Sequence, residues 1–302
     1  MRRDDGGAWA PTSPARASLQ TTLLQLRGDW LGCALLGLAE GQADALAQRL
    51  VRADPHGELG HLRRALRLAG CAADDALLQR HLAHRLWCEA RDAQWMQGGT
   101  VRPLRHRVEG AHWYQETAGH PTLLVLPMTL ALVDSLDVIR RVLRGRPCIV
   151  YGEGVVAPEG DGIEVAGEGL RAVRRIHEVL AAHGVLCTYA DFAYAHHAAV
   201  PARLFGTERP VARGFVSLAL RQGVHLLPLS LTLDASRETC TCAFSESLCI
   251  GTGGGTAPED RHPAMAGLVA QLLEQAIAVA PWQWLLLPTL AFDTCRQHPD
   301  AT

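Results

Sequence analysis

Short apolar runs alternate with longer amphipathic segments from about residue 98 onward, and this alternation limits the possible fold more than any other feature. The runs have the length of buried strands, whereas the segments between them repeat apolar residues at helical spacing. Such alternation is typical of a sheet with helices packed on its faces. We therefore predict an α/β domain over residues 98–295, with a central mixed sheet wrapped by helices. The expected strands are 122–127, 148–151, 185–190, 200–205, 224–233 and 239–244, and the expected helices are 129–144, 169–183, 210–222 and 262–279.

The chain before this domain has a different character. Residues 1–18 are polar and rich in Gly, Pro and Arg, so we expect a disordered tail there. Leucines then recur at near-helical spacing through residues 19–97, which predicts a helical amino-terminal region. Either Asp74 or Asp75 is placed to cap the last helix of that region.

Charge and hydropathy restrict the partners of the chain. The formal net charge is -2, and nothing in the charge pattern requires a nucleic acid or an acidic membrane surface. The most apolar early stretch, Trp30–Ala39, is shorter than the ~20 residues of a membrane-spanning helix. We therefore expect a protein that purifies without detergent. Any membrane contact is expected to be peripheral, at the inner membrane and through Trp30–Leu38.

The nine cysteines lie mostly inside apolar runs, as buried free thiols do. This usage is typical of the reducing cytoplasm, which we take as the expected location. Cys240 and Cys242 face the same side of an expected strand, but two thiols alone do not make a zinc site. We interpret them as core residues and expect neither a metal nor a cofactor.

Several motifs carry more information in their order than any one of them alone. A buried strand leads to Asp191, a second apolar strand ends in Phe205-Gly206, and Gly214 opens a helix. The run Pro281-Trp282-Gln283-Trp284 stands near the end of the chain. In this order the motifs resemble the lipid A biosynthesis branch of the lysophospholipid acyltransferase superfamily, over residues ~105–290.

Members of that family transfer a fatty acyl group from a thioester, on acyl carrier protein or coenzyme A, to a hydroxyl group. The resemblance therefore implies an acyl thioester as partner and substrate-binding roles for Phe205 and Gly206. The active site of the family is a His-x-x-x-x-Asp/Glu motif just after the first strand. Its carboxylate orients the imidazole, which removes the hydroxyl proton during attack on the thioester.

The chain departs from this motif at the histidine. Asp134 stands where the family has its acid, but the position five residues earlier is Thr129. Threonine cannot act as a base near neutral pH, and losing a general base typically lowers a rate by ~10²–10⁴-fold. Asp134 is therefore either a surviving catalytic acid or a residue that stabilises the first turns of a helix. Thr129 is either part of an altered catalytic site or an N-cap.

Other candidate site residues follow the third expected strand. Asp191 lies where ligand sites of α/β sheets form, and we expect it to line the cleft or to be a structural acid there. His196 and His197 follow within a loop, so either one of them replaces the missing base or both are solvated loop residues. His106, His112 and His120 precede the strand at 122–127 and are expected away from its carboxyl end.

Two charged regions bear on substrate and partner. The loop at 152–168 is acidic where the family tends to carry a basic acceptor-binding region, so lipid A itself is not the expected acceptor. Arginines on two expected helices either dock an acidic carrier protein or belong to solvated helix faces. They are Arg140, Arg141, Arg144, Arg146, Arg171, Arg174 and Arg175.

Two functional hypotheses follow. In the first, the chain is an acyltransferase-like enzyme that passes an acyl group to an unknown acceptor by a mechanism without the usual histidine. In the second, it is a catalytically inactive relative that binds acyl chains or a carrier protein as a subunit of a biosynthetic complex. Thr129 favours the second hypothesis, whereas the remaining motifs support the fold and favour neither.

Overall fold

The computed structural model describes residues 42–54, 59–96, 98–151, 163–166, 169–191, 199–221, 223–249 and 258–291. The disordered tail expected at 1–18, the apolar stretch Trp30–Ala39 and the two histidines His196 and His197 lie outside these residues. The helical region expected at 19–97 is described only from residue 42, and the acidic loop expected at 152–168 only at 163–166.

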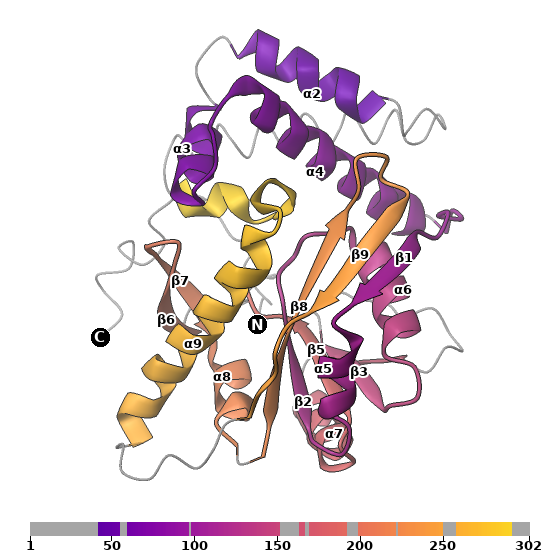
Figure 1. The fold of residues 1–302 in the computed structure, drawn as a ribbon, viewed down its shortest axis with the longest axis vertical. Helices are drawn as coiled ribbons and strands as arrows, with labels where there is room; N and C mark the ends of the chain where they lie inside the picture. Colours follow the sequence, from indigo (N-terminus) through magenta and orange to yellow (C-terminus); the bar gives the residue numbers. More distant parts are fainter. Residues whose placement is uncertain are drawn as a thin grey trace, which may run out of the picture.

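A mixed sheet forms the centre of the structure (Figure 1). Its strands are β1 (Arg105–Glu109), β2 (Thr122–Leu126), β3 (Cys148–Tyr151), β4 (Ile163–Ala166), β5 (Val185–Tyr189), β8 (His225–Leu233), β9 (Thr239–Phe244) and β10 (Leu248–Cys249). Seven of them follow the order β1-β9-β8-β2-β5-β3-β4, and β10 pairs with β8. Strands β8, β2, β5, β3 and β4 are parallel, whereas β9 is antiparallel to β8. The predicted α/β class with a central mixed sheet is confirmed.

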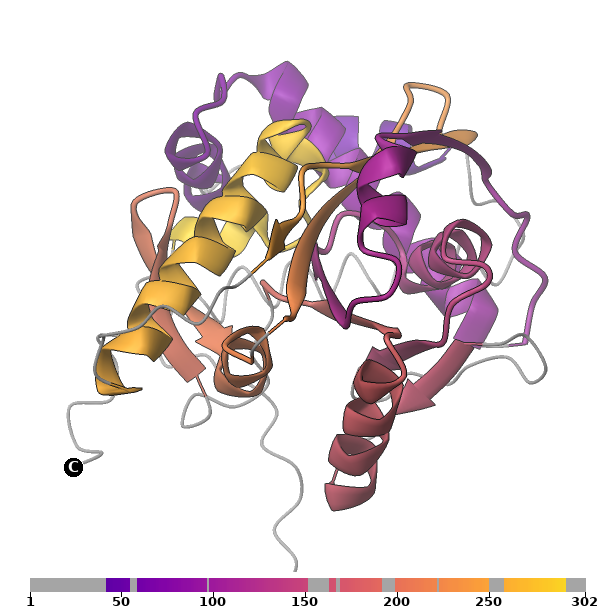
Figure 2. The same cartoon turned by 60° about the horizontal axis from the view of Figure 1, so that its bottom comes forward.

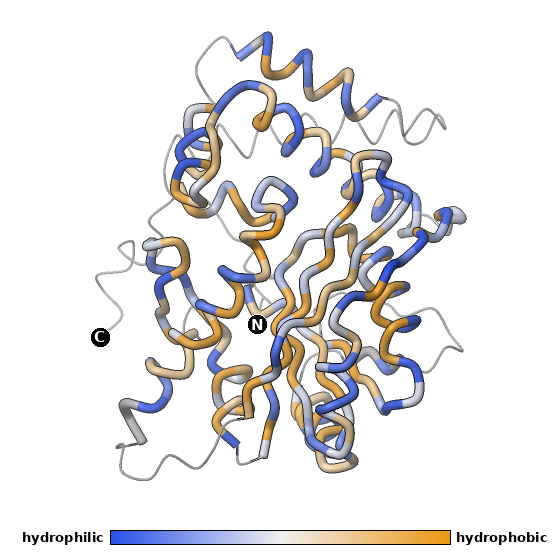
Figure 3. Tube along the Cα trace, viewed as in Figure 1, coloured by the Kyte–Doolittle hydropathy of each residue, from blue (hydrophilic) through white to orange (hydrophobic). Residues whose placement is uncertain are grey.

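The core follows the central strands. Every residue of β2 is buried, as expected for a parallel strand covered on both faces, and Figure 3 shows the central strands among the most hydrophobic parts of the chain. Cys240 and Cys242 are both buried, which confirms their interpretation as core residues. Among the described helices, none combines the length and the apolar character that crossing a bilayer requires.

Helices lie around this sheet. The described helices are α2 (Gln42–Ala53), α3 (Gly60–Leu68), α4 (Asp75–Met96), α5 (Ala111–Glu116), α6 (Leu132–Val142), α7 (Leu170–Ala181), α8 (Arg213–Ala219), α9 (Pro258–Ala278) and the 3-10 helices η2 (Pro281–Gln283) and η3 (Leu287–Ala291). Helix α9 lies on one side of the sheet and α6 on the other (Figures 1 and 2). Helix α4 contacts α2, α6 and η2, so it connects the amino-terminal helices to the sheet. The amide of Leu77 donates to Asp74 Oδ1 at 2.7 Å, which confirms Asp74 as the predicted cap.

Two edge strands differ from the sequence expectation. Residues 163–166, expected in an acidic loop, form β4 and pair with β3. His106 lies in β1, an edge strand that pairs with β9 and whose residues are all exposed. β1 has no buried face and β4 has only four residues, so neither gives an apolar pattern long enough to identify a strand.

The expected helix at 210–222 begins later than predicted, because residues 207–212 form a strand. β6 (Ala199–Leu204) and β7 (Thr207–Ala212) make an antiparallel hairpin. Its turn is Phe205-Gly206, with φ of 49° and 72°, and positive φ at both central residues is the signature of a type I′ turn. The Phe205 amide donates to the carboxylate of Glu274 on α9, which helps to hold this unusual backbone conformation.

Candidate functional site

The carboxyl ends of β2 and β5 meet at one edge of the sheet, where α/β folds place their ligand sites. The amide of Met128, just after β2, donates to Oδ2 of Asp191, just after β5, at 3.0 Å. Thr129 follows Met128 directly. The prediction that Thr129 and Asp191 lie at the same edge of one sheet is therefore confirmed.

Thr129 is not the N-cap of the following helix, and that prediction is wrong. Its side chain is buried, and its hydroxyl donates to the carbonyl of Leu231 on β8 at 2.7 Å. Helix α6 begins three residues later, at Leu132, with Ala131 as N-cap and no capping bond from that residue. The first amides of the helix, at Leu132 and Val133, donate instead to the two carboxylate oxygens of Asp92, each at 3.0 Å.

Asp92 is thus a cap supplied from outside the helix, by α4. Such a cap leaves no local signal next to Thr129, so spacing along the sequence could not have identified it. Burial raises the pKa of Asp92 to about 6, while the hydrogen bonds from the two amides oppose that rise.

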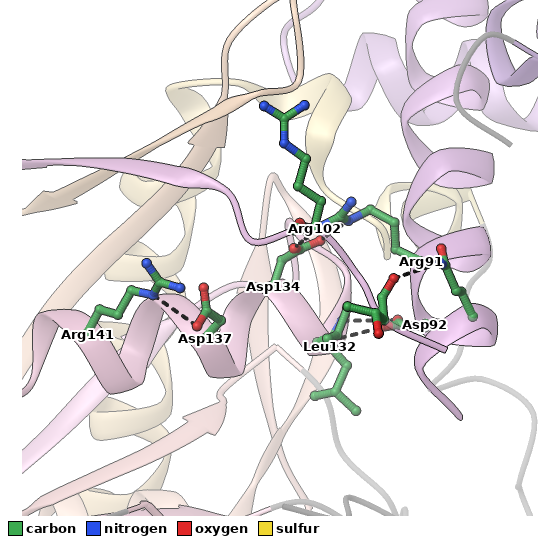
Figure 4. A network of polar contacts seen from close by, with 10 residues as sticks. Arg91, Asp92, Arg102, Leu132, Asp134, Asp137 and Arg141 are labelled. Carbon is green, nitrogen blue, oxygen red and sulfur yellow. Dashed lines mark hydrogen bonds and ion pairs between the residues drawn. The ribbon is translucent and has the colours of Figure 1, made fainter. Parts of the chain in front are cut away.

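Asp134 lies in the first turn of α6, and its carboxylate binds an arginine side chain (Figure 4). Arg91 on α4 donates from Nε to Oδ2 and from Nη2 to Oδ1, both at 2.6 Å. The side chains of Arg91 and Asp134 are 7% and 3% exposed, so this is a buried two-point ion pair. Nη2 of Arg91 also donates to the carbonyl of Arg102 at 2.7 Å, and its guanidinium lies over the Trp87 ring.

The contact with Arg91 changes the interpretation of Asp134. In a His-x-x-x-x-Asp motif the carboxylate must accept a hydrogen bond from the imidazole. Here the two carboxylate oxygens of Asp134 each accept a hydrogen bond from the guanidinium of Arg91. The planar guanidinium donates both bonds side by side and so fixes the orientation of the carboxylate. Neither of the two roles considered from the sequence included this partner.

Asp191 is held on one oxygen only. Its Oδ2 accepts from the Met128 amide and, at 2.6 Å, from Nε1 of the buried Trp284. Its Oδ1 is buried and has no hydrogen-bond partner among the described residues. Burial raises the pKa of Asp191 to about 6, and the bonds from Met128 and Trp284 oppose that rise. The ring of Phe205 lies 6.1 Å from that of Trp284, so the predicted substrate-binding turn Phe205-Gly206 is close to Asp191.

The segment Pro281–Leu285 crosses the same edge of the sheet. The side-chain amide of Gln283 pairs with both the amide and the carbonyl of Leu233, at the end of β8, at 2.8 Å each. Trp284 binds Asp191 beyond β5, and the Leu285 amide donates to the Met128 carbonyl beyond β2 at 2.8 Å. This segment therefore ties together the carboxyl ends of three parallel strands.

Two histidines that the sequence interpretation missed approach this edge from α4. Nε2 of His84 contacts the Thr129 carbonyl at 2.8 Å, and Nδ1 of His81 contacts the Trp282 carbonyl at 2.8 Å. Both rings are completely buried, and burial lowers the pKa of His81 to about 3 and that of His84 to about 4. They follow one another at helical spacing within a leucine-rich helix, which is the only signal that the sequence gives.

His84 and Cys88 do not form a nucleophilic pair, although Cys88 Sγ lies 3.6 Å from His84 Nε2. A carbonyl oxygen can only accept, so Nε2 carries the proton that it donates to Thr129 and cannot take one from the thiol. Burial also holds the pKa of Cys88 well above its usual value, so the thiol stays protonated.

The other polar candidates lie elsewhere or make structural contacts. His120 lies against His225 at the amino end of β8, with the ring centroids 4.5 Å apart, so it lies away from the site, as predicted. Arg146 donates to the carbonyls of His120 and His183, and Arg140 and Arg141 both pair with Asp137 on their own helix. Within the described ranges, no three His, Cys, Asp or Glu side chains gather as a metal site.

Comparison of the chain with protein-family models and with curated proteins found no match.

Proposed function

We propose that this chain is an acyltransferase-like protein that binds an acyl thioester but has lost the histidine-dependent transfer step. The observation that carries this proposal is the two-point ion pair between Asp134 and Arg91. It occupies the carboxylate that the resemblance assigns to orienting a catalytic histidine, and the histidine position itself is Thr129.

The surroundings of Thr129 support the same proposal. Its hydroxyl donates to the Leu231 carbonyl, and its backbone carbonyl accepts from His84. The residue therefore links the end of β2 to β8 and α4. A buried threonine with both groups satisfied contributes to packing and stability rather than to proton transfer. The acyl thioester, from a carrier protein or coenzyme A, comes from the resemblance of the ordered motifs.

A second candidate function is acyl transfer by an altered mechanism, and Asp191 favours it. Its unpartnered Oδ1 lies at the edge where substrates of α/β folds bind, and its pKa of about 6 is close to the range in which a carboxylate serves as a general base. In that mechanism Asp191 would remove the acceptor hydroxyl proton in place of the missing histidine.

One pair of measurements separates the two functions. Binding is measured by calorimetry with a thioether analogue of an acyl-coenzyme A and with an acylated carrier protein, and turnover is measured by release of free thiol. The proposal predicts saturable binding and no turnover above the buffer rate. Turnover that follows a single pKa near 6 and disappears in Asp191→Asn would instead establish the second function. Absence of binding to both probes would overturn both.

A further inference from the structure

Strand β1 lies at an edge of the central sheet and has a free side. It pairs in parallel with β9, and no other strand in the described part of the chain pairs with it (Figure 1). All of its residues are exposed, and the apolar side chain of Val108 is 39% exposed. An exposed edge of this kind can pair with a strand of another molecule.

The hydrogen bonds to β9 determine which backbone groups of β1 remain free. The Arg105 amide donates to the carbonyl of Glu238, the residue before β9, at 2.9 Å. Successive residues of a strand direct their backbone groups to alternate sides, so every second residue from Arg105 faces β9. His106 and Val108 therefore direct their amide and carbonyl groups outward, where a further strand can bind them.

We propose that β1 pairs antiparallel with β1 of a second copy of this chain, about a twofold axis at Arg107. In this register His106 of each copy lies opposite Val108 of the other, and the outward groups make four backbone hydrogen bonds. All residues of the strand then take part. A shift by one residue toward the carboxyl end would place His106 opposite Gly110, whose carbonyl already accepts the Trp113 amide where α5 begins.

The charges of β1 are complementary to themselves in this register. Arg105 of each copy lies directly opposite Glu109 of the other, which gives two cross-strand pairs of opposite charge. Arg107 faces its own counterpart across the axis, but it also pairs with Glu109 of its own strand at 2.7 Å. A shift toward the amino end would instead place Arg105 opposite Arg107. Charged residues on an edge usually prevent pairing with other strands, and here they select one partner, the same strand of a second copy.

The test is sedimentation velocity of the full chain over a series of concentrations that reaches the millimolar range. One pair of five-residue strands is a small interface, so we expect a monomer in dilute solution and a dimer in concentrated solution. High salt should weaken the dimer, because it screens the cross-strand charges.

Charge reversal tests the register. Glu109→Arg and Arg105→Glu each turn both cross-strand pairs into pairs of like charge, so each variant alone should associate about 30-fold more weakly than the wild type. A mixture of the two variants should form a heterodimer about as tight as the wild-type dimer, because every cross-strand pair is then again of opposite charge.

Two other variants serve as controls. Val108→Pro removes an outward amide that donates no bond to β9, so it should abolish association and leave the monomer folded, as judged by circular dichroism. Arg174→Glu reverses a charge on α7, at a side chain that is 84% exposed, and should associate as the wild type does. The inference rests on the fold and not on the proposed function. It is overturned if the wild type stays monomeric throughout the series, if either β1 charge variant alone associates as tightly as Arg174→Glu, or if their mixture associates no more tightly than each alone.

Discussion

Removing either partner of the Arg91–Asp134 ion pair should strongly destabilise the protein. Both side chains are buried, with exposures of 7% and 3%, and two hydrogen bonds of 2.6 Å join them. Loss of one partner leaves the other charge buried without its counterion, which typically costs about 3–5 kcal/mol. We therefore expect Asp134→Ala and Arg91→Ala each to lower the free energy of unfolding by about that amount, measured by urea denaturation followed by circular dichroism.

The double variant Arg91→Met/Asp134→Leu makes this test specific. It removes both charges and fills their volume, so it should recover most of the loss; the unpaired Arg102 carbonyl should leave a deficit of about 1–3 kcal/mol. The exposed pair between Arg102 and Glu238 is the control, and Glu238→Ala should cost less than about 1 kcal/mol. The reasoning is refuted if the single variants are as stable as this control, or if the double variant is less stable than both singles.

Two further predictions concern stability. His81 and His84, with folded pKa values of about 3 and 4, bind protons in the unfolded state below their usual 6.5, so they lower the free energy of unfolding as the pH falls. Asp92 and Asp191 have folded pKa values of about 6, so as the pH falls they bind protons in the folded state before they do so in the unfolded state. They therefore raise the free energy of unfolding as the pH falls from about 6 to their ordinary pKa of 3.8. Each group changes the free energy of unfolding by up to about 1.4 kcal/mol per pH unit, so the two histidines and the two aspartates nearly cancel. Urea titrations should therefore give a free energy of unfolding that is nearly constant from pH 6 to 4 in the wild type and rises on acidification in His81→Leu/His84→Leu. Parallel profiles for the two proteins would contradict this. Gly110→Ala should lower the melting temperature more than Gly145→Ala does. Both glycines have positive φ, but only at Gly110 would the new Cβ lie 2.2 Å from the Phe244 carbonyl oxygen. Equal losses in the two variants would contradict that steric argument.

The sequence predicts the central sheet well, because its buried strands are continuous apolar runs between turn residues. Strands β2, β3, β5, β8 and β9 were all expected within a few residues of their observed bounds. The edge strands β1 and β4 were missed, since β1 is exposed along its whole length and has little apolar periodicity to detect, and β4 has only four residues. The hairpin turn Phe205-Gly206 was missed because phenylalanine seldom adopts positive φ, so no turn was indicated there.

The candidate site is only partly visible in the sequence for a different reason. Thr129, Asp134 and Asp191 could be found because they stand at fixed positions relative to strands. The residues that define their roles, Arg91 and His84, lie on α4, about forty residues before Asp134 and Thr129. Which polar residues of a helix face inward depends on how that helix packs, and this information is not present in local spacing.

The most direct test of the account is acyl turnover by the wild type and by Asp134→Asn, measured together with the folded fraction of each sample. Thiol release is followed from an acyl-coenzyme A and from an acylated carrier protein. If Asp134 is a structural partner of Arg91 and the transfer step is lost, the wild type releases no thiol above the buffer rate, and Asp134→Asn changes stability alone. Turnover by the wild type that Asp134→Asn abolishes, with the protein still folded, would contradict the account and identify Asp134 as a catalytic acid.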